Sequence, residues 1–166
     1  MYGVSTRRPL FEATSDVSAH SYRRCGSGAA IPRATASFRP LIGIAREKGV
    51  SAYVGDGLNR WPAVHRLDAA HLYRLALEKG SAGARFHGVA DEGLPVRDIA
   101  AVIGRRLNVP VLAKSPEEAA DHFGWLAHFV GIDCPASSAQ TQERLGWRPR
   151  QPALFPDLDR ARYFET

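Results

Sequence analysis

Apolar positions recur with a helical or strand period from residue 40 onward, whereas the residues before it show neither period. The clearest run predicts an amphipathic helix over residues 96–107, because its apolar positions follow a 3.6-residue spacing. These positions are Val96, Ile99, Ala100, Ile103 and Leu107. Arginines occupy the other side of this helix, as expected of a face turned to solvent.

Boundary residues predict the other helices. Pro40 and Gly49 delimit a short one, and Asp68 and Gly80 fit the N-cap and the stop of a helix over residues 69–79. Ser115, Pro116 and Glu118 have the capping-box spacing, which opens a helix expected to continue to Phe129. Two shorter helices are predicted before Gly146 and after Pro152.

Short runs rich in β-branched and aromatic residues predict strands between these helices. The predicted strands cover residues 51–54, 63–67, 84–90 and 109–113, and residues 91–95 are predicted to form a loop. Because strands and helices alternate along the chain, the predicted fold class is α/β.

The chain changes character near residue 40. Residues 1–39 are rich in Ser, Arg, Ala and Gly and have no period, so this segment is expected to be irregular, either disordered or an aberrant start. Residues 40–166 are expected to form the folded part. A chain of 166 residues has room for about one domain.

The net charge of +5 and the pI of about 9.6 suit an anionic ligand. Nucleic acid is not an expected partner, because the arginines are scattered rather than gathered in a basic stripe with aromatic residues. No apolar run approaches the roughly 20 residues that span a bilayer, and the first residues lack the apolar middle of a signal peptide. The expected location is therefore cytoplasmic, away from membranes.

Gly55 and Gly57 invite comparison with a phosphate-binding loop. The third glycine of a dinucleotide fingerprint is replaced by Arg60, and no helix follows, so a turn with positive φ is the better interpretation. Arg60 and Trp61 leave two interpretations open. They either contact a ligand, through a bidentate guanidinium and a stacking indole, or form a surface arginine beside a core tryptophan.

No other group of residues predicts a catalytic or metal site. The six histidines lack metal-binding spacing, and no Gly-x-Ser-x-Gly motif supports a hydrolase. His65 and His87 fall in predicted strands, where a lone histidine is more often packed or solvated than catalytic. Asp91 and Glu92 are adjacent, so their carboxylates would point apart. No metal and no catalytic residue is therefore predicted.

Three segments between residues 55 and 149 carry a family resemblance: GDGLNRWPAVHRLDAAHLYRLAL, FHGVADEGLPVRDIAAVIGRRL and TQERLGWRP. In this order and spacing they resemble the carboxyl-terminal half of extended or atypical short-chain dehydrogenase/reductases, the NAD-dependent epimerase/dehydratase family. The resemblance implies a partial Rossmann-like fold with short strands and several helices. It also implies that Arg60, with its neighbours Asn59 and Trp61, contacts the substrate.

The resemblance does not extend to the amino-terminal half of the family. That half carries a Gly-x-x-Gly-x-x-Gly loop for NAD or NADP and a Tyr-x-x-x-Lys pair that moves the proton and holds the ribose. Neither motif occurs in this chain, so no cofactor is expected for the chain alone. Where many family members have Arg-Asp, this chain has Arg60-Trp61, which makes a nucleotide-sugar substrate less expected.

Two functions follow from these observations. The first is the substrate-binding part of a truncated NAD(P)-dependent oxidoreductase or epimerase, inactive alone and bound to a small-molecule substrate through Asn59, Arg60 and Trp61. Without the rest of the sheet, such a part would expose an apolar face and associate with itself. The alternative is a non-enzymatic binding module for an anionic small molecule or a protein partner. The sequence leaves open whether the chain is an enzyme.

Overall fold

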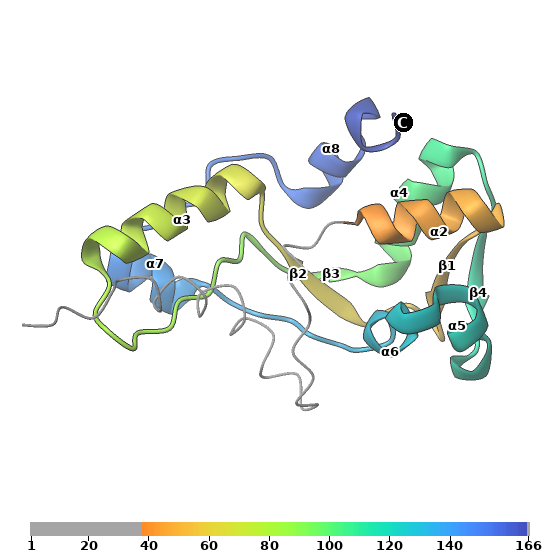
Figure 1. The fold of residues 1–166 in the computed structure, drawn as a ribbon, viewed down its shortest axis with the longest axis horizontal. Coiled ribbons are helices and arrows are strands. Elements are labelled where there is room, and N and C mark those ends of the chain that lie inside the picture. The colour runs from red at the N-terminus through yellow and green to blue at the C-terminus, as the bar shows by residue number, and fades with distance from the viewer. Residues whose placement is uncertain (1–37, 166) are drawn as a thin grey trace, which may run out of the picture.

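The computed structural model describes residues 38–165, and the expectation for residues 1–37 lies outside this range. Figure 1 shows two groups of helices joined by a two-stranded ribbon, β2–β3. The strands are β1 (Ser51–Val54), β2 (Arg60–Ala63), β3 (Asp91–Pro95) and β4 (Val111–Lys114). The longer helices are α2 (Arg39–Lys48), α3 (Arg66–Lys79), α4 (Val96–Leu107), α5 (Pro116–Phe123) and α7 (Ala139–Leu145). Short helical turns are η2 (Gly124–Leu126), α6 (Ala127–Val130), α8 (Leu154–Leu158) and η3 (Ala161–Tyr163).

The strands β1 and β4 form a parallel pair, with Ser51 opposite Val111. Helix α4 covers one face of this pair, where the Ser51 hydroxyl donates to the Ala100 carbonyl at 2.8 Å. Gly104 lets α4 approach closely, because a Cβ at this position would lie 2.3 Å from Val111 Cγ2. A parallel pair connected by helices is the α/β arrangement predicted from the sequence, and the fold class is confirmed.

Within the described residues, β1 pairs with β4 alone. The amides of Ser51 and Gly55 donate toward the β4 side, to the carbonyls of Pro110 and Lys114, both at 2.9 Å. Because alternate residues of a parallel strand face opposite neighbours, Ala52 directs its N–H and C=O away from β4. The edge of β1 at Ala52 therefore has no strand partner among residues 38–165.

The antiparallel ribbon β2–β3 corrects three sequence predictions. Residues 91–95 form a strand rather than a loop, residues 84–90 form no strand, and β2 ends at Ala63 instead of spanning 63–67. Asp, Glu, Gly and Pro are poor strand formers, so local propensity gave the wrong answer for β3. Pairing with β2 overrides it: Arg60 lies opposite Pro95, and Trp61 lies opposite Leu94.

Helix α3 begins three residues earlier than predicted. His65 is its N-cap, and the Nδ1 atom of His65 accepts from the backbone N–H of Leu67 at 3.2 Å. The prediction that Asp68 is the N-cap is therefore wrong. Asp68 lies in the first turn and is buried, because its carboxylate accepts the backbone N–H groups of Arg150 and Gln151 at 3.0 and 2.9 Å.

The other helix boundaries agree closely with the sequence. The ends of α4 are as predicted, and α2 and α7 stop at Gly49 and Gly146, which have φ of 65° and 66°. The Ser115–Glu118 capping box opens α5 with both of its hydrogen bonds. The predicted continuation to Phe129 is wrong, because Gly124 adopts φ 54° and ψ −127° and breaks the helix into α5, η2 and α6.

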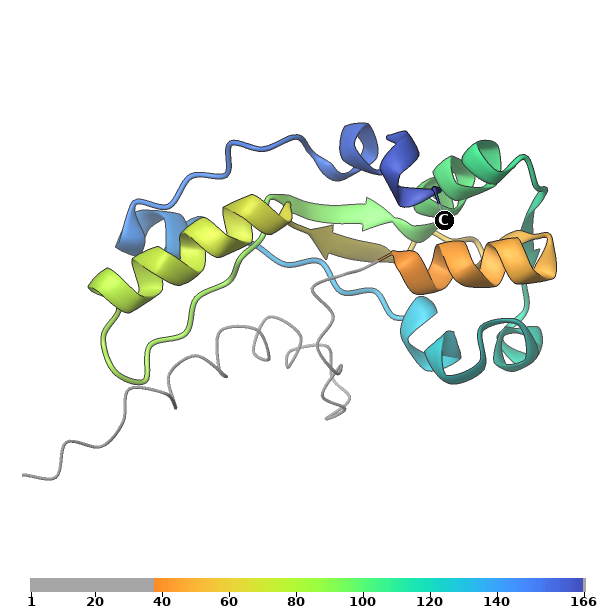
Figure 2. The ribbon, with the colours of Figure 1, turned by 45° about the horizontal axis from the view of Figure 1, so that its top comes forward.

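Three apolar clusters hold the structure together. One joins α2, α4 and Leu158 of α8, and a second joins β1, α4, α5 and α6. The third lies between α3 and α7, where Leu72 and Trp147 are almost fully buried. Figure 2 shows the segment after α7 running back across the molecule, which brings α8 beside α4. No helix in residues 38–165 is long and apolar enough to cross a membrane.

Candidate functional site

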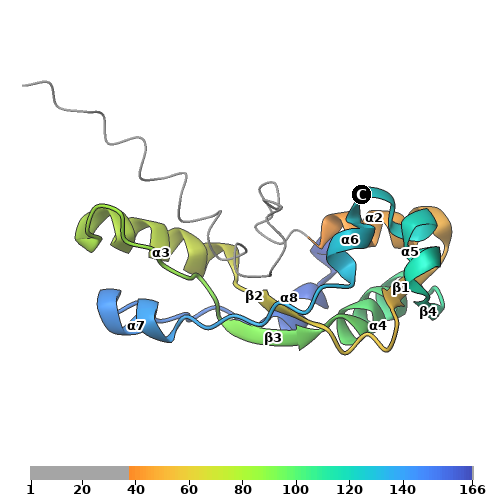
Figure 3. The ribbon, with the colours of Figure 1, turned by 90° about the horizontal axis from the view of Figure 1, so that it is seen from below.

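Asn59 and Trp61 lie where the β1–β2 turn enters the ribbon, and both hold the segment that follows α6. The Asn59 side-chain amide donates to the carbonyls of Val130 and Ile132, at 2.7 and 3.1 Å. The indole Nε1–H of Trp61 donates to the same Ile132 carbonyl at 3.2 Å. Figure 3 shows this segment, between α6 and α7, running alongside β2 and β3. The two side chains therefore hold the segment after α6 against the ribbon.

Arg60 forms a bidentate ion pair with Asp133. Its Nε donates to Asp133 Oδ1 at 3.1 Å and one terminal nitrogen donates to Oδ2 at 2.9 Å, while its backbone N–H donates to Oδ1 at 2.7 Å. These hydrogen bonds hold the pKa of the Asp133 carboxyl below its ordinary value, and Asp133 raises the pKa of Arg60. The guanidinium is 49% exposed but already matched to a carboxylate, so a phosphate would compete with Asp133.

The structure thus brings Asn59, Arg60 and Trp61 together through the 130–134 segment. The predicted turn before them is confirmed: Gly55 and Gly57 have φ of 63° and 66°, and Asp56 Oδ1 accepts the Leu58 N–H at 2.9 Å. Gly57 also permits a close approach, since a Cβ there would lie 2.6 Å from Arg97 Cβ. These glycines shape the turn between β1 and β2, which belong to different sheets, and their amides donate to the carbonyls of Lys114 and Val54.

His87 and its neighbours are joined by hydrogen bonds that hold the loop before β3. The His87 backbone N–H donates to Thr141 Oγ1 at 2.7 Å, and its Nδ1 lies 3.1 Å from the Ser137 carbonyl. Ser137 in turn donates to Glu92 Oε1 at 2.5 Å. Across residues 38–165 no group of three or more His, Cys, Asp or Glu side chains could hold a metal ion.

Sequence reasoning missed a cavity of about 310 Å³ between the two helix groups. Its walls come from the start of α2, the junction of β2 with α3, the start of β3 and the carboxyl-terminal segment. The charged and polar lining residues are Arg39, His65, Arg66, Asp91, Asp157, Arg162 and Tyr163. The apolar lining residues are Phe38, Ala63, Val64, Pro152, Leu154 and Leu158.

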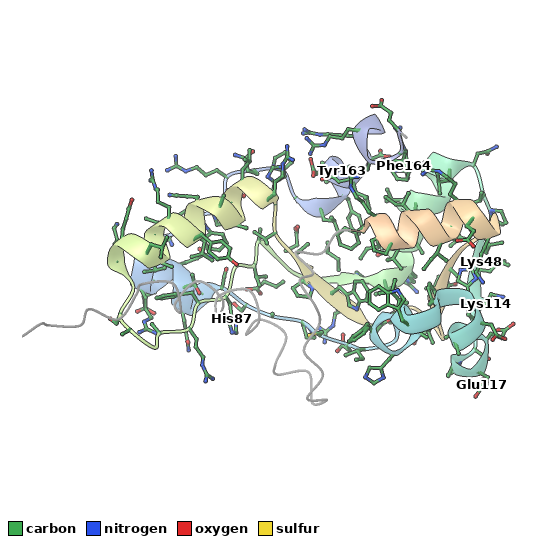
Figure 4. The ribbon with its side chains drawn as sticks, in the orientation of Figure 1. Lys48, His87, Lys114, Glu117, Tyr163 and Phe164 are labelled. Atoms are coloured by element: carbon green, nitrogen blue, oxygen red, sulfur yellow. The ribbon has the colours of Figure 1, made fainter. Side chains whose placement is uncertain are left out.

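Asp157 of α8 is the most heavily engaged side chain in this cavity. It accepts hydrogen bonds from the Tyr163 hydroxyl, at 2.5 Å, and from the Arg162 guanidinium. Arg160 pairs with the same carboxylate at 3.7 Å. Burial, followed by the hydrogen bond to Asp157, raises the pKa of Tyr163, whose position beside α8 is visible in Figure 4. The only sequence signal was an aspartate followed closely by arginines and a tyrosine.

His65 lies beside Asp157 in the wall of the cavity. Its side chain is only 7% exposed, and its Nε2 lies 3.8 Å from Asp157 Oδ1, which is too long for a hydrogen bond. Because Nδ1 accepts the Leu67 N–H, the proton of the neutral ring resides on Nε2. The sequence predicted His65 as a strand residue, whereas the structure places it at a helix start and in the wall of a cavity.

Two yeast proteins are similar in sequence to this chain. Uncharacterized protein C2A9.02 of Schizosaccharomyces pombe is 55% identical over 124 residues, which cover 75% of this chain and 42% of that protein. Uncharacterized protein YLL056C of Saccharomyces cerevisiae is 44% identical over 170 residues, covering 97% of this chain and 57% of that protein. The chain thus spans about half the length of the curated relatives it matches. No family model matches it.

Solved structures share the fold. The dTDP-glucose 4,6-dehydratase DesIV of Streptomyces venezuelae, crystallised with NAD and TYD, matches with a TM-score of 0.56 and 21% identity over 75% of this chain. Pal of Bacillus thuringiensis matches with a TM-score of 0.52 and 13% identity, also over 75% of this chain. The matches cover only 36% and 37% of those chains. The fold is therefore that of one part of Rossmann-fold, NAD-binding dehydratases and reductases.

Proposed function

We propose that this chain is the substrate-binding part of a longer NAD(P)-dependent oxidoreductase or epimerase-like protein, and that it is inactive alone. The observation that carries the proposal is the parallel pair β1–β4, in which Ala52 turns its backbone groups away from β4. Parallel strands normally lie inside larger sheets covered by helices on both faces. The missing neighbour of β1 would be supplied by the cofactor-binding part of such a protein.

The sequence also supports the assignment of cofactor binding to a different part of the protein. It contains neither a glycine-rich dinucleotide loop nor a Tyr-x-x-x-Lys pair, which are the parts that bind NAD(P) and move the proton in the family it resembles. The yeast relatives are about twice as long as the matched region, which leaves room for such a part. NAD or NADP is then the cofactor of the whole protein, and this chain contributes the wall that faces the substrate.

Asn59, Arg60 and Trp61 are the residues we assign to that wall. Half of the Arg60 side chain is exposed, so it can reach a substrate, but its charge is matched by Asp133. A polar, uncharged hydroxyl or carbonyl compound fits this arrangement better than a nucleotide-sugar, whose phosphates would have to displace a bidentate carboxylate. For the same reason we rank an anion-binding module centred on Arg60 and Trp61 second.

Cofactor binding tests the proposal. Calorimetry with NADH and NADPH on the purified chain should give no saturable heat. A chimera that joins the unmatched portion of the Schizosaccharomyces pombe relative to this chain should bind one of the two dinucleotides. The unmatched portion alone serves as the control for binding that does not need this chain. Dinucleotide binding by the isolated chain, or its absence from a cooperatively folded chimera, would overturn the proposal.

Self-association is the second consequence of the proposal. Leu112 of β4 is 45% exposed and Trp125 is 66% exposed. Isolated apolar side chains are common on surfaces, but Leu112 lies on β4, which like β1 has one free edge among residues 38–165, and an unpaired sheet edge invites pairing with a second chain. Light scattering after size exclusion should show a concentration-dependent dimer that Leu112→Lys weakens. A strictly monomeric wild-type chain would count against a missing sheet neighbour.

A further inference from the structure

The cavity between α2, α3 and α8 has a donor-rich wall and an apolar floor. We propose that it binds a small organic carboxylate with a short apolar or aromatic body. The site is separate from Asn59, Arg60 and Trp61, none of which lines the cavity. Binding there requires neither NAD(P) nor the remainder of a longer protein.

His65 supplies the first element of recognition. The imidazole is more than nine-tenths buried and lines the cavity. Its Nδ1 is occupied as the acceptor of the Leu67 N–H, so Nε2 carries the proton and has no hydrogen-bond partner among residues 38–165. Nε2 lies 3.8 Å from Asp157 Oδ1, beyond hydrogen-bond distance, and it borders the cavity, so it is available to donate to a ligand oxygen. A ligand bound in the cavity is therefore expected to place a hydrogen-bond acceptor next to His65 Nε2.

Arginines supply the second element. Arg39 and Arg66 line the cavity, and neither has a carboxylate partner within the described part of the chain. The two acidic residues of the lining are already engaged: Asp91 accepts the Leu154 N–H at 2.9 Å, and Asp157 is held by Arg162 and Tyr163. The positive end of the 14-residue helix α3 opens at the same place. The arginines of the lining (Arg39, Arg66 and Arg162) outnumber its aspartates (Asp91 and Asp157), so the net charge of these lining residues is positive.

Size and floor define the rest of the ligand. A volume of about 310 Å³ lies at the lower end of the range of small-molecule pockets. Phe38 and Leu158 of the lining are buried core residues, and Val64 and Leu154 continue the apolar surface. Such a floor accepts a ring or a short alkyl chain, while the carboxylate meets His65 and the arginines. Larger anions such as dinucleotides would not fit.

A matched pair of ligands tests the charge requirement. Benzoate and benzamide have nearly the same shape, and only benzoate carries a negative charge. Titration of the full ¹⁵N-labelled chain should give saturable amide shifts at Arg66, Leu67 and Tyr163 with benzoate, with an affinity at least about tenfold above that for benzamide. Equal affinities, or the absence of saturable shifts up to the solubility limit of benzoate, would overturn the inference.

Variants test the residues. His65→Asn keeps an N-cap for α3 but removes the imidazole donor, and the double variant Arg39→Gln/Arg66→Gln removes the unmatched charge. Each should weaken benzoate binding by about tenfold. Arg74→Gln is the control, because Arg74 lies on α3, is 67% exposed and pairs with Glu78 away from the cavity. Benzoate affinity that Arg39→Gln/Arg66→Gln leaves unchanged would rule out the site.

The outcomes also separate this inference from the proposed function. Benzoate binding by the chain alone tests the cavity, whereas dinucleotide binding by the chimera tests the missing cofactor part. If the chain does not bind benzoate but the chimera binds NADH, the inference about the cavity is wrong and the proposed function stands. If the chain binds benzoate but the chimera does not bind NADH, the inference about the cavity stands and the proposed function is wrong.

Discussion

The indole Nε1–H of Trp147 donates a 3.0 Å hydrogen bond to the carbonyl of Asp68, and Trp147 is fully buried. The carboxylate of the same aspartate accepts the backbone N–H groups of Arg150 and Gln151. Asp68 therefore ties the first turn of α3 to the segment that leads to α8. This one residue connects the α3–α7 cluster to the wall of the cavity.

Asp68→Ala should destabilise the chain by about 3 kcal/mol, because it removes the charged acceptor of two part-buried backbone N–H groups, those of Arg150 and Gln151. Asp121→Ala is the control, since the Asp121 side chain is exposed and Asp121 contacts Lys48 through its backbone carbonyl. Urea unfolding followed by tryptophan fluorescence measures both. A cost below about 1 kcal/mol for Asp68→Ala would show that water replaces the lost acceptor.

Two glycine substitutions should have opposite effects. Gly104→Ala places a methyl group 2.3 Å from Val111 Cγ2 and 3.1 Å from the Val109 carbonyl, so α4 must move off the sheet at a cost of about 1–3 kcal/mol. Gly43→Ala on the exposed side of α2 meets nothing within 4 Å and should stabilise by about 0.5–1 kcal/mol. Thermal unfolding of the two variants gives the comparison. Stabilisation by both would contradict the close approach of α4.

His122 should make stability depend on pH. Burial, with smaller effects from Lys48 and Lys114, lowers the pKa of its imidazole below 6.5, and its Nε2 is buried without a partner in residues 38–165. Figure 4 shows Lys48 and Lys114 at the same end of the molecule. Because the unfolded chain takes up the proton first, stability should fall as pH drops below 6.5 and level off below the folded pKa.

His122→Phe should flatten this pH dependence, because the substitution removes the titrating group and keeps a ring of similar size. Unfolding midpoints in urea between pH 7.5 and pH 5 would show it, with His128→Phe as the control, since His128 is exposed. An unchanged slope in His122→Phe would assign the pH dependence to another group.

The Arg60–Asp133 pair makes a prediction at lower pH. Arg60 holds the pKa of the Asp133 carboxyl below 3.8, so the pair stabilises the fold above that pH and the contribution is lost as pH falls through the folded pKa. Arg60→Ala should return the Asp133 pKa toward 3.8, measured by carbon NMR of the carboxyl group. Arg97→Ala, which removes an equally exposed arginine paired with Asp98, should leave it unchanged.

Local signals in the sequence were sufficient for features that depend on interactions between residues close together in the chain. The capping box at Ser115, the stops at Gly49 and Gly146, and the full extent of α4 were predicted because each depends on neighbours within one or two turns. The turn at Gly55 and Gly57 was predictable for the same reason, since positive φ favours glycine.

Long-range contacts explain what the sequence did not predict. Residues 91–95 become a strand because β2 pairs with them, and Asp68 is buried because the backbone at Arg150 reaches it from 82 positions away. The cavity around His65 is assembled from four separate parts of the chain, and no motif links them. Asn59 and Trp61 were predicted as site residues, but their bonds to the Ile132 carbonyl depend on tertiary structure.

The two helix groups are joined by more than the β2–β3 ribbon. The segment between α6 and α7 runs beside the ribbon, held by hydrogen bonds from Cys134 to Arg60 and from Ala136 to Glu92, and the segment after α7 crosses back to α8. Connections along several segments restrict bending and twisting of one helix group against the other more than a single connection would. We therefore expect the walls of the cavity between the groups to move little when a ligand binds.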